Sequence, residues 1–196
     1  MTKIDAIIFD LNGIFINSTP LSQRVEEKFN INRDLFYQEF EKILKITRSP
    51  EKHSPNIWQP ITDLLKININ EFLDFWFSGE SIDHQMLNYV KELKDNGYKI
   101  FILSNNLQER TDYYRKNFPE LFNNFDGAYF SWETGFIKPD IKAFQNILDQ
   151  NHLLSQNCIY FDDSQANVQT AISFGIHARV FEDLISTKKF IEENKF

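Results

Sequence analysis

Short apolar runs alternate with helical patterns along much of the chain. The runs are rich in Ile and Phe and lack polar alternation, as is typical of strands buried on both faces of a parallel sheet. They lie at residues 4–9, 98–103, 127–131, 158–161 and 177–181. Apolar residues recur at helical spacing over residues 83–97, 138–151 and 163–175. This alternation predicts an α/β fold built on a doubly wound parallel sheet.

One long segment departs from this alternation. Residues 19–82 contain helical patterns, for example over 35–46 and 57–67, but no convincing strand. A loop at 47–56 with two prolines separates these two patterns. We therefore expect a helical cap subdomain at 19–82, inserted into a core domain formed by residues 1–18 and 83–196.

Composition and charge narrow the class of protein. A chain of 196 residues suits one domain or a core with an inserted subdomain. Hydrophobic residues make up 42% and aromatic residues 15%, which argues against disorder. The net charge of −7 is unfavourable for holding a nucleic acid backbone, so we expect no nucleic acid partner.

Cysteine, histidine and hydropathy patterns exclude further classes. Cys158 is the only cysteine, so neither an internal disulfide nor a Cys-rich metal site can form. The four histidines lack metal-ligand spacing. The apolar runs are too short for a signal peptide or a membrane span, and we expect a soluble, cytoplasmic protein.

Polar residues with related chemistry follow the predicted strands. Asp10 ends the first run, Ser104 follows the second, and Asp162 and Asp163 follow the fourth, while Lys138 precedes a predicted helix. In an open parallel sheet, ligands bind beyond the carboxyl ends of the strands. A carboxylate nucleophile beside a hard cation, with an ammonium and a hydroxyl to hold anionic oxygens, suits phosphoryl transfer through an aspartyl phosphate.

The order of these segments resembles a known superfamily. "FDLNG" at 9–13, "LSNN" at 103–106, "GFIKPD" at 135–140 and "YFDDSQAN" at 160–167 occur in sequence, each at or just after a predicted strand end. The chain is similar to the haloacid dehalogenase superfamily, specifically to phosphatase-like members with a helical cap between the first and second motifs. The cap segment resembles the family in its position along the chain more than in its amino-acid sequence.

The resemblance implies a role for each site residue. Asp10 would be the nucleophile that takes up the phosphoryl group. Ser104 and the following backbone amides, including that of Asn105, would bind the phosphoryl group, and Lys138 would neutralise charge. The implied cofactor is Mg²⁺, which offsets the repulsion between carboxylate and phosphate.

The implied metal ligands come from both ends of the chain. Asp10, the backbone carbonyl of Asn12 and Asp163 would bind the ion, with Asp162 as a second or water-mediated ligand. Asn167 would orient the loop of the fourth motif.

Asn12 is a departure from the phosphatase pattern, in which a second Asp usually protonates the leaving oxygen and then activates water. An amide cannot act as a general acid or base near neutral pH. Four explanations stay open: an engineered variant of an active phosphatase, a natural slow phosphatase, a phosphate-binding or regulatory member without turnover, and a dehalogenase.

From these observations we expect a Mg²⁺-dependent hydrolase of a small phosphorylated metabolite, with a sugar phosphate as one possible substrate. The competing expectation is a catalytically silent protein that binds phosphate. The cap would close over the site, exclude water and select the substrate. Its residues able to reach a polar substrate include Arg24, Arg48, Lys52, His53 and Trp58.

Overall fold

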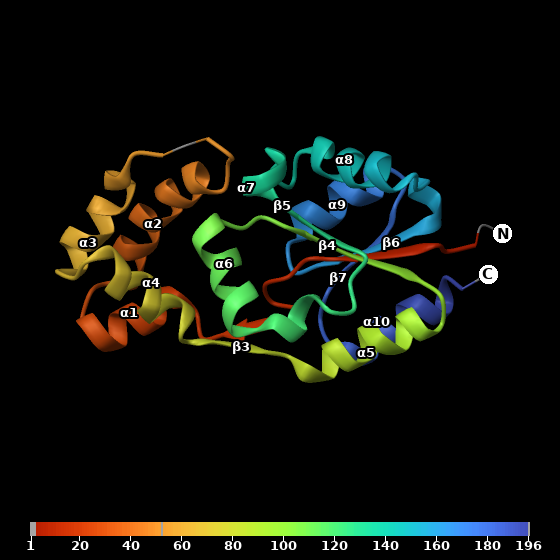
Figure 1. The fold of residues 1–196 in the computed structure, drawn as a ribbon, viewed down its shortest axis with the longest axis horizontal. Helices are drawn as coiled ribbons and strands as arrows, with labels where there is room; N and C mark the ends of the chain where they lie inside the picture. Colours follow the sequence, from red (N-terminus) through yellow and green to blue (C-terminus); the bar gives the residue numbers. More distant parts are fainter. Residues whose placement is uncertain (1–2, 52, 196) are drawn as a thin grey trace.

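The centre of the fold is a parallel sheet of five strands (Figure 1). The computed structural model describes residues 3–51 and 53–195. The strand order is β5-β4-β1-β6-β7, and the strands are β1 (Ala6–Phe9), β4 (Lys99–Ser104), β5 (Gly127–Phe130), β6 (Cys158–Asp162) and β7 (His177–Val180). Each lies close to one of the apolar runs, which confirms the predicted parallel sheet.

Helices cover both faces of the sheet, as Figure 1 shows. Helices α5 (His84–Asp95) and α10 (Leu184–Glu193) pack on one face against side chains such as Ile7 and Phe9. Helices α8 (Ile141–Asn151) and α9 (Gln165–Ser173) pack on the other face against Ala6 and Ile8. Because successive residues of a strand point to opposite faces, β1 supplies both cores. The doubly wound fold is therefore confirmed.

Shorter elements complete the core domain. The helix α6 (Gln108–Asn117) follows β4 and lies between the sheet and the cap. The remaining elements are η2 (Pro119–Phe122), α7 (Ser131–Thr134) and η3 (Ser155–Asn157).

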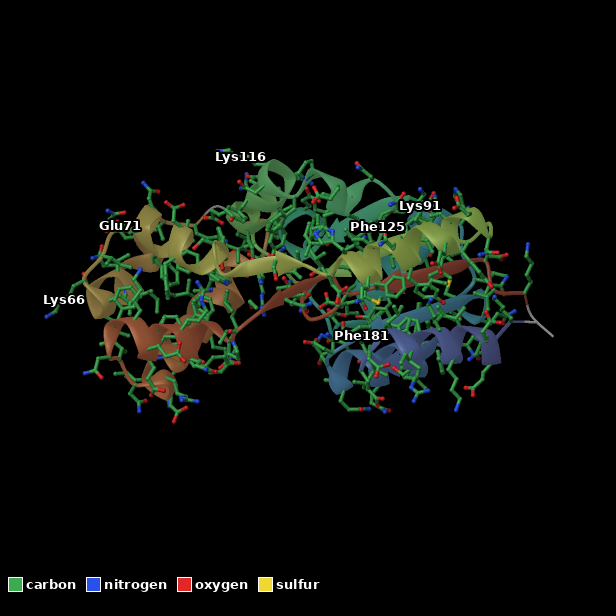
Figure 2. The ribbon with its side chains drawn as sticks, turned by 90° about the horizontal axis from the view of Figure 1, so that it is seen from below. Lys66, Glu71, Lys91, Lys116, Phe125 and Phe181 are labelled. Atoms are coloured by element: carbon green, nitrogen blue, oxygen red, sulfur yellow. The ribbon has the colours of Figure 1, made fainter. Side chains whose placement is uncertain are left out.

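The segment after β1 forms a second, helical lobe with its own core. It contains α1 (Leu21–Phe29), α2 (Arg33–Thr47), η1 (Pro55–Trp58), α3 (Gln59–Leu65) and α4 (Ile69–Phe77). Buried aromatic rings fill its centre, with Phe40 and Trp76 centroids 4.8 Å apart and Trp58 and Phe72 centroids 5.7 Å apart. Figure 2 shows Lys66 and Glu71 at the end of this lobe that is far from core helix α5, which carries Lys91.

The expectation that residues 19–82 contain no strand was wrong at the end of that segment. A two-stranded antiparallel ribbon, β2 (Ile16–Ser18) and β3 (Glu80–Ile82), joins the cap to the core. Three residues are too few to display a period of two, so the pattern could not reveal β3. The chain passes between the two lobes twice, once in β2 and once in β3, and the ribbon places these two segments side by side, with Ile16 opposite Ile82.

Among the helices of residues 3–51 and 53–195, none combines the length and apolar character needed to cross a membrane.

The aromatic core of the cap leads to a stability prediction. Phe72 is fully buried and contacts Phe36, Phe40, Trp58 and Trp76. We expect Phe72→Ala to lower the free energy of unfolding by about 3–5 kcal/mol, because the ring leaves a cavity. Urea denaturation measures this change. Leu35→Ala, at a side chain 48% exposed, is the control and should cost less than about 1 kcal/mol; an equal loss in both variants would contradict the described cap core.

Candidate functional site

The carboxyl ends of β1, β4 and β6 meet at one edge of the sheet. Phe9 pairs with Ile102 of β4 and with Phe161 of β6, so Asp10 lies beside Asp162. The chain adds β4 and β5 on one side of β1 and β6 and β7 on the other. Such a reversal of strand order opens a crevice at the carboxyl ends of the strands. The site thus forms where the predicted motifs were expected to meet.

Three carboxylates converge at this edge. One oxygen each from Asp10, Asp162 and Asp163 lies within 4.8 Å of the others. Gly13 allows this approach: its φ is +82°, and a Cβ there would lie 2.8 Å from Asp163 Oδ2. An L side chain would therefore be strained and would collide with Asp163.

Lys138 joins two of the carboxylates. Its Nζ donates to Asp10 Oδ1 at 2.9 Å and to Asp162 Oδ2 at 2.6 Å. The side chain is only 2% exposed. Burial alone would lower the pKa of Lys138, but Asp10 and Asp162 raise the pKa above its usual value. The lysine is thus a fixed positive charge beside the expected nucleophile.

Asp162 is enclosed by hydrogen-bond donors. Ser164 N donates to Oδ1 at 2.8 Å, Asn167 Nδ2 lies 3.0 Å from both oxygens, and the Tyr160 hydroxyl also donates to Oδ2. Burial opposes ionisation, yet Lys138 and these donors keep the pKa of Asp162 below its usual value. This arrangement favours a role in holding Lys138 and the loop, while metal ligation by Asp162 stays a prediction.

Asn105 and Ser104, both predicted to bind phosphate, lie at the carboxyl end of β4. The Asn105 side chain accepts from Lys138 N and donates to Lys138 O, both at 2.8 Å, so it fixes the backbone of the lysine. Ser104 ends β4, and its hydroxyl is buried without a hydrogen-bond partner among the described residues. A buried hydroxyl without a partner is costly, but Ser104 is not among the residues that line the cavity at this edge, so its contact with phosphate stays a prediction.

A cavity of about 340 Å³ opens at these groups. Asp10, Asn12, Lys138 and Asp163 line it together with Arg48 and Arg110. The remaining lining residues are Asn105, Pro139, Ser164, Ala166 and Asn167. Asp10, Asn12, Asn105, Lys138, Asp163 and Asn167, all predicted from the motifs, are therefore brought together in one place.

Among the expected cap contacts that lie in the described part of the chain, Arg48 is the one that reaches this cavity. Its Nε is buried without a hydrogen-bond partner in the described part of the chain. Burial and the nearby Arg110 guanidinium lower the pKa of Arg48, although Asp10 opposes the shift. The Arg48 guanidinium thus lies at the same cavity as Asp10 and Asp163, with an Nε that has no partner among the described residues.

The other cap candidates lie elsewhere. Arg24 donates to the backbone carbonyls of Phe75 and Trp76, inside the cap. Trp58 belongs to the cap core, and with His53 it lines a separate cleft of about 880 Å³ between the cap and the core. Lys52 lies outside the described residues.

Asn12 is held by groups that the motifs did not indicate. The Tyr114 hydroxyl lies 2.9 Å from Asn12 Oδ1 and 2.8 Å from Glu80 Oε2. Glu80 in turn pairs with Arg110, whose Nη2 lies 2.5 Å from Oε1. The side chain of Glu80 is fully buried, and Tyr114 has no exposed surface.

Some of these residues carried a signal in the sequence. Arg110 and Tyr114 are four residues apart and share one face of α6. Tyr160 and Asp162 are two residues apart and share one face of β6. Glu80 carried no such signal, because its partners Arg110 and Tyr114 are distant in the sequence and β3 was not expected.

The donor set fits a hard divalent cation. Carboxylate oxygens are the ligands that Mg²⁺ prefers. Burial, with Asp10 and Asp162 nearby, raises the pKa of Asp163 to about 6. Burial also raises the pKa of Asp10, although Lys138 opposes the shift. The three carboxylates of Asp10, Asp162 and Asp163 lie close together around one ammonium, and a cation would offset their remaining repulsion. Asp10 and Asp163, with the Asn12 backbone carbonyl, would hold such an ion.

This charge balance predicts a pH-dependent affinity for Mg²⁺. Protons compete with the metal for Asp163, so affinity should be high above pH 6 and fall as the pH drops below that value. Between pH 7 and pH 5 we expect the Mg²⁺ dissociation constant to rise about tenfold. Calorimetric titration of the protein at both pH values measures it. In Asp163→Asn the affinity should be weak at both; an unchanged affinity in that variant would show that Asp163 does not bind the metal.

Comparison with known proteins agrees with this geometry. The profile of haloacid dehalogenase-like hydrolases matches residues 7–181. The chain is 22% identical to bifunctional epoxide hydrolase 2 of Rattus norvegicus over 94% of its own length and 38% of that protein. It is 27% identical to the sesquiterpene phosphatase astK of Aspergillus oryzae over 54% of its own length and 53% of that protein. The chain therefore matches less than two thirds of either relative.

Solved structures share the fold. The HAD family enzyme bt-2542 of Bacteroides thetaiotaomicron superposes with a TM-score of 0.81 at 20% identity, covering 95% of this chain and 99% of that one. The same enzyme has also been solved as a magnesium complex, with a TM-score of 0.78, 20% identity, and coverage of 96% and 100%. At this identity the likeness concerns the fold.

Proposed function

The chain belongs to the haloacid dehalogenase-like hydrolase family, and from this premise we propose that it is a Mg²⁺-dependent hydrolase of a small phosphomonoester. The observation that carries the proposal is the position of Asp10. Its carboxylate lies at the edge of a small cavity, bonded to the buried Lys138 ammonium and grouped with Asp163. An oriented carboxylate beside fixed positive charge is suited to attack on phosphorus.

The reaction would proceed in two steps at Asp10. A carboxylate oxygen of Asp10 forms a bond to phosphorus, the ester P–O bond breaks, and the leaving alkoxide takes a proton. Water then attacks the aspartyl phosphate, which releases inorganic phosphate and restores the Asp10 carboxylate. Bound Mg²⁺ would supply charge neutralisation between the carboxylate and the phosphoryl oxygens.

The surrounding residues would bind and orient. Lys138 would neutralise charge on the phosphoryl oxygens, and the free hydroxyl of Ser104 would donate to one of them. Asn12 lies at the cavity but can neither give nor take a proton in these steps. Proton transfer to the leaving group and from the attacking water is therefore the weak part of this site. Relatives that include a phosphatase support the reaction class.

Substitutions at Asp10 and Asn12 test the proposed reaction. With p-nitrophenyl phosphate and Mg²⁺, Asp10→Asn should reduce phosphate release to the uncatalysed background, because the nucleophile is lost. Asn12→Asp should raise the turnover rate, up to ~10²–10⁴-fold, because a carboxyl group can exchange protons. Asn123→Asp, at an exposed position, is the control and should leave the rate unchanged.

Other outcomes would redirect the assignment. If neither the wild-type protein nor Asn12→Asp hydrolyses any member of a panel of metabolite phosphomonoesters, yet both bind phosphate with Mg²⁺, the catalytically silent alternative is favoured. Release of halide from a 2-haloacid would instead favour a dehalogenase.

The cavity also indicates the size and charge of the substrate. A volume of about 340 Å³ is small for a ligand site and suits a compact metabolite. Arg48 is the group from the cap at this cavity, and it lacks a bonded acid among the described residues. We infer that Arg48 contacts an anionic oxygen of the substrate and thereby links substrate binding to the cap.

Removal of the Arg48 charge tests this contact. Arg48→Met should lower kcat/KM for the preferred phosphomonoester by about 10–100-fold, the worth of one hydrogen bond to a charged group. Steady-state kinetics in the Asn12→Asp background would make the effect measurable. Lys45→Met removes an exposed charge from α2, the helix that ends just before Arg48, and should leave kcat/KM unchanged; equal losses in both variants would indicate a general charge effect.

A further inference from the structure

The hydroxyl of Tyr114 lies between two acceptor-bearing side chains. It is 2.8 Å from Glu80 Oε2 and 2.9 Å from the Asn12 side-chain atom assigned as Oδ1. Tyr114 and the Glu80 side chain are fully buried. Within the described residues, the hydroxyl bonds to Glu80 and Asn12, and the Arg110 guanidinium that pairs with Glu80 also lies close to it.

The Tyr114 hydroxyl has one proton, and Glu80 is the stronger hydrogen-bond acceptor for it. A phenol can donate one hydrogen bond and accept others through its lone pairs. Glu80 forms an ion pair with the Arg110 guanidinium, with Nη2 at 2.5 Å and Nε at 3.4 Å. A charged acceptor makes the stronger bond, so Tyr114 donates to Glu80. Its lone pairs then face Asn12.

Asn12 can then offer a proton of its own to this oxygen. The nitrogen and oxygen of a side-chain amide have nearly the same shape, and a half-turn about χ2 exchanges them. We propose that Tyr114 is a positioning residue: it accepts a hydrogen bond from Asn12 Nδ2 and so turns the carbonyl oxygen of Asn12 toward the cavity. With Nδ2 in place of Oδ1 beside the hydroxyl, Tyr114 donates to Glu80 and accepts from Asn12.

Because of this arrangement, an amide at position 12 is more favourable than a carboxylate. A carboxylate there would place a second charged acceptor on a hydroxyl whose single proton already bonds to Glu80. Asn12 is thus integrated into the buried network that joins the β3 ribbon to α6. The consequence for catalysis rests on the proposed function: the amide oxygen can accept a hydrogen bond from the attacking water but cannot remove its proton.

Nuclear magnetic resonance of the ¹⁵N-labelled protein tests the orientation. In the wild type, one side-chain amide proton of Asn12 should be protected from solvent exchange. In Tyr114→Phe both Asn12 amide signals should shift, and this proton should exchange at least about tenfold faster, because its acceptor is gone. Unchanged Asn12 signals and exchange in Tyr114→Phe would overturn the proposal.

The protein contains a matched internal control. Asn151 Nδ2 donates to the Tyr129 hydroxyl at 2.7 Å and to Ile147 O at 2.8 Å, on the far side of β4 in the sheet order. The same pair of residue types thus occurs outside the site. Its amide signals should be unaffected by Tyr114→Phe, and Tyr129→Phe should shift Asn151 but not Asn12.

Thermal unfolding without divalent metal gives a second, independent test. Asn12→Asp should lower Tm by roughly 3–5 °C, because an acceptor faces an oxygen without a proton to share. In the Tyr114→Phe background the same substitution should cost about 2–4 °C less. If Tyr114 instead donates to Asn12, a carboxylate would be the better acceptor, and Asn12→Asp would cost more in the Tyr114→Phe background.

These measurements do not depend on turnover. If no phosphomonoester is hydrolysed, the proposed function fails while the amide signals and the Tm values still decide the orientation of Asn12. If Tyr114→Phe does not fold, the exchange of the Asn12 amide protons in the wild type decides: one protected proton supports the proposal, and two freely exchanging protons overturn it.

Discussion

The site depends on one buried interaction, the ammonium of Lys138 held between Asp10 and Asp162. Two carboxylates this close would repel, and burial would favour their neutral forms. The ammonium between them makes an ionised Asp10 compatible with a buried strand end. A broken buried ion pair is strongly destabilising, so the surrounding groups that fix Lys138 are as necessary as the pair itself.

The residues around this interaction divide into those that hold and those that face the cavity. Asn105 fixes the Lys138 backbone, and Tyr160 and Asn167 fix Asp162. Asp10, Asp163 and Arg48 face the cavity and retain capacity for a ligand. A second network, Asn12–Tyr114–Glu80–Arg110, lies on the cap side and joins the ribbon between the lobes to the cavity. One group of residues thus fixes the positions of the charged side chains, and a different group is exposed to the cavity.

Much of this arrangement could be predicted from sequence because it follows local rules. Buried strands of a parallel sheet read as apolar runs, and the polar residue that ends each run marks the ligand edge, as Asp10, Ser104 and Asp162 do. The strand and helix periods place Tyr160 on the same face as Asp162 and Tyr114 on the same face as Arg110. A tyrosine within an apolar pattern is nevertheless interpreted as a core residue, so neither was predicted to belong to the site.

Other features depend on contacts between distant segments. Strand β3 has too few residues to show a period of two. The role of Glu80 becomes apparent only in the structure, where Arg110 and Tyr114 form hydrogen bonds with it. The position of Arg48, rather than Arg24, at the cavity likewise became visible only once the cap was placed on the core.

The nucleophilic role of Asp10 is tested by mass spectrometry of the protein, quenched in acid during reaction with a phosphomonoester and Mg²⁺. We expect one phosphoryl group on the peptide that contains Asp10, and none in Lys138→Met. A phosphoryl group on another residue, or hydrolysis without any labelled peptide, would contradict it.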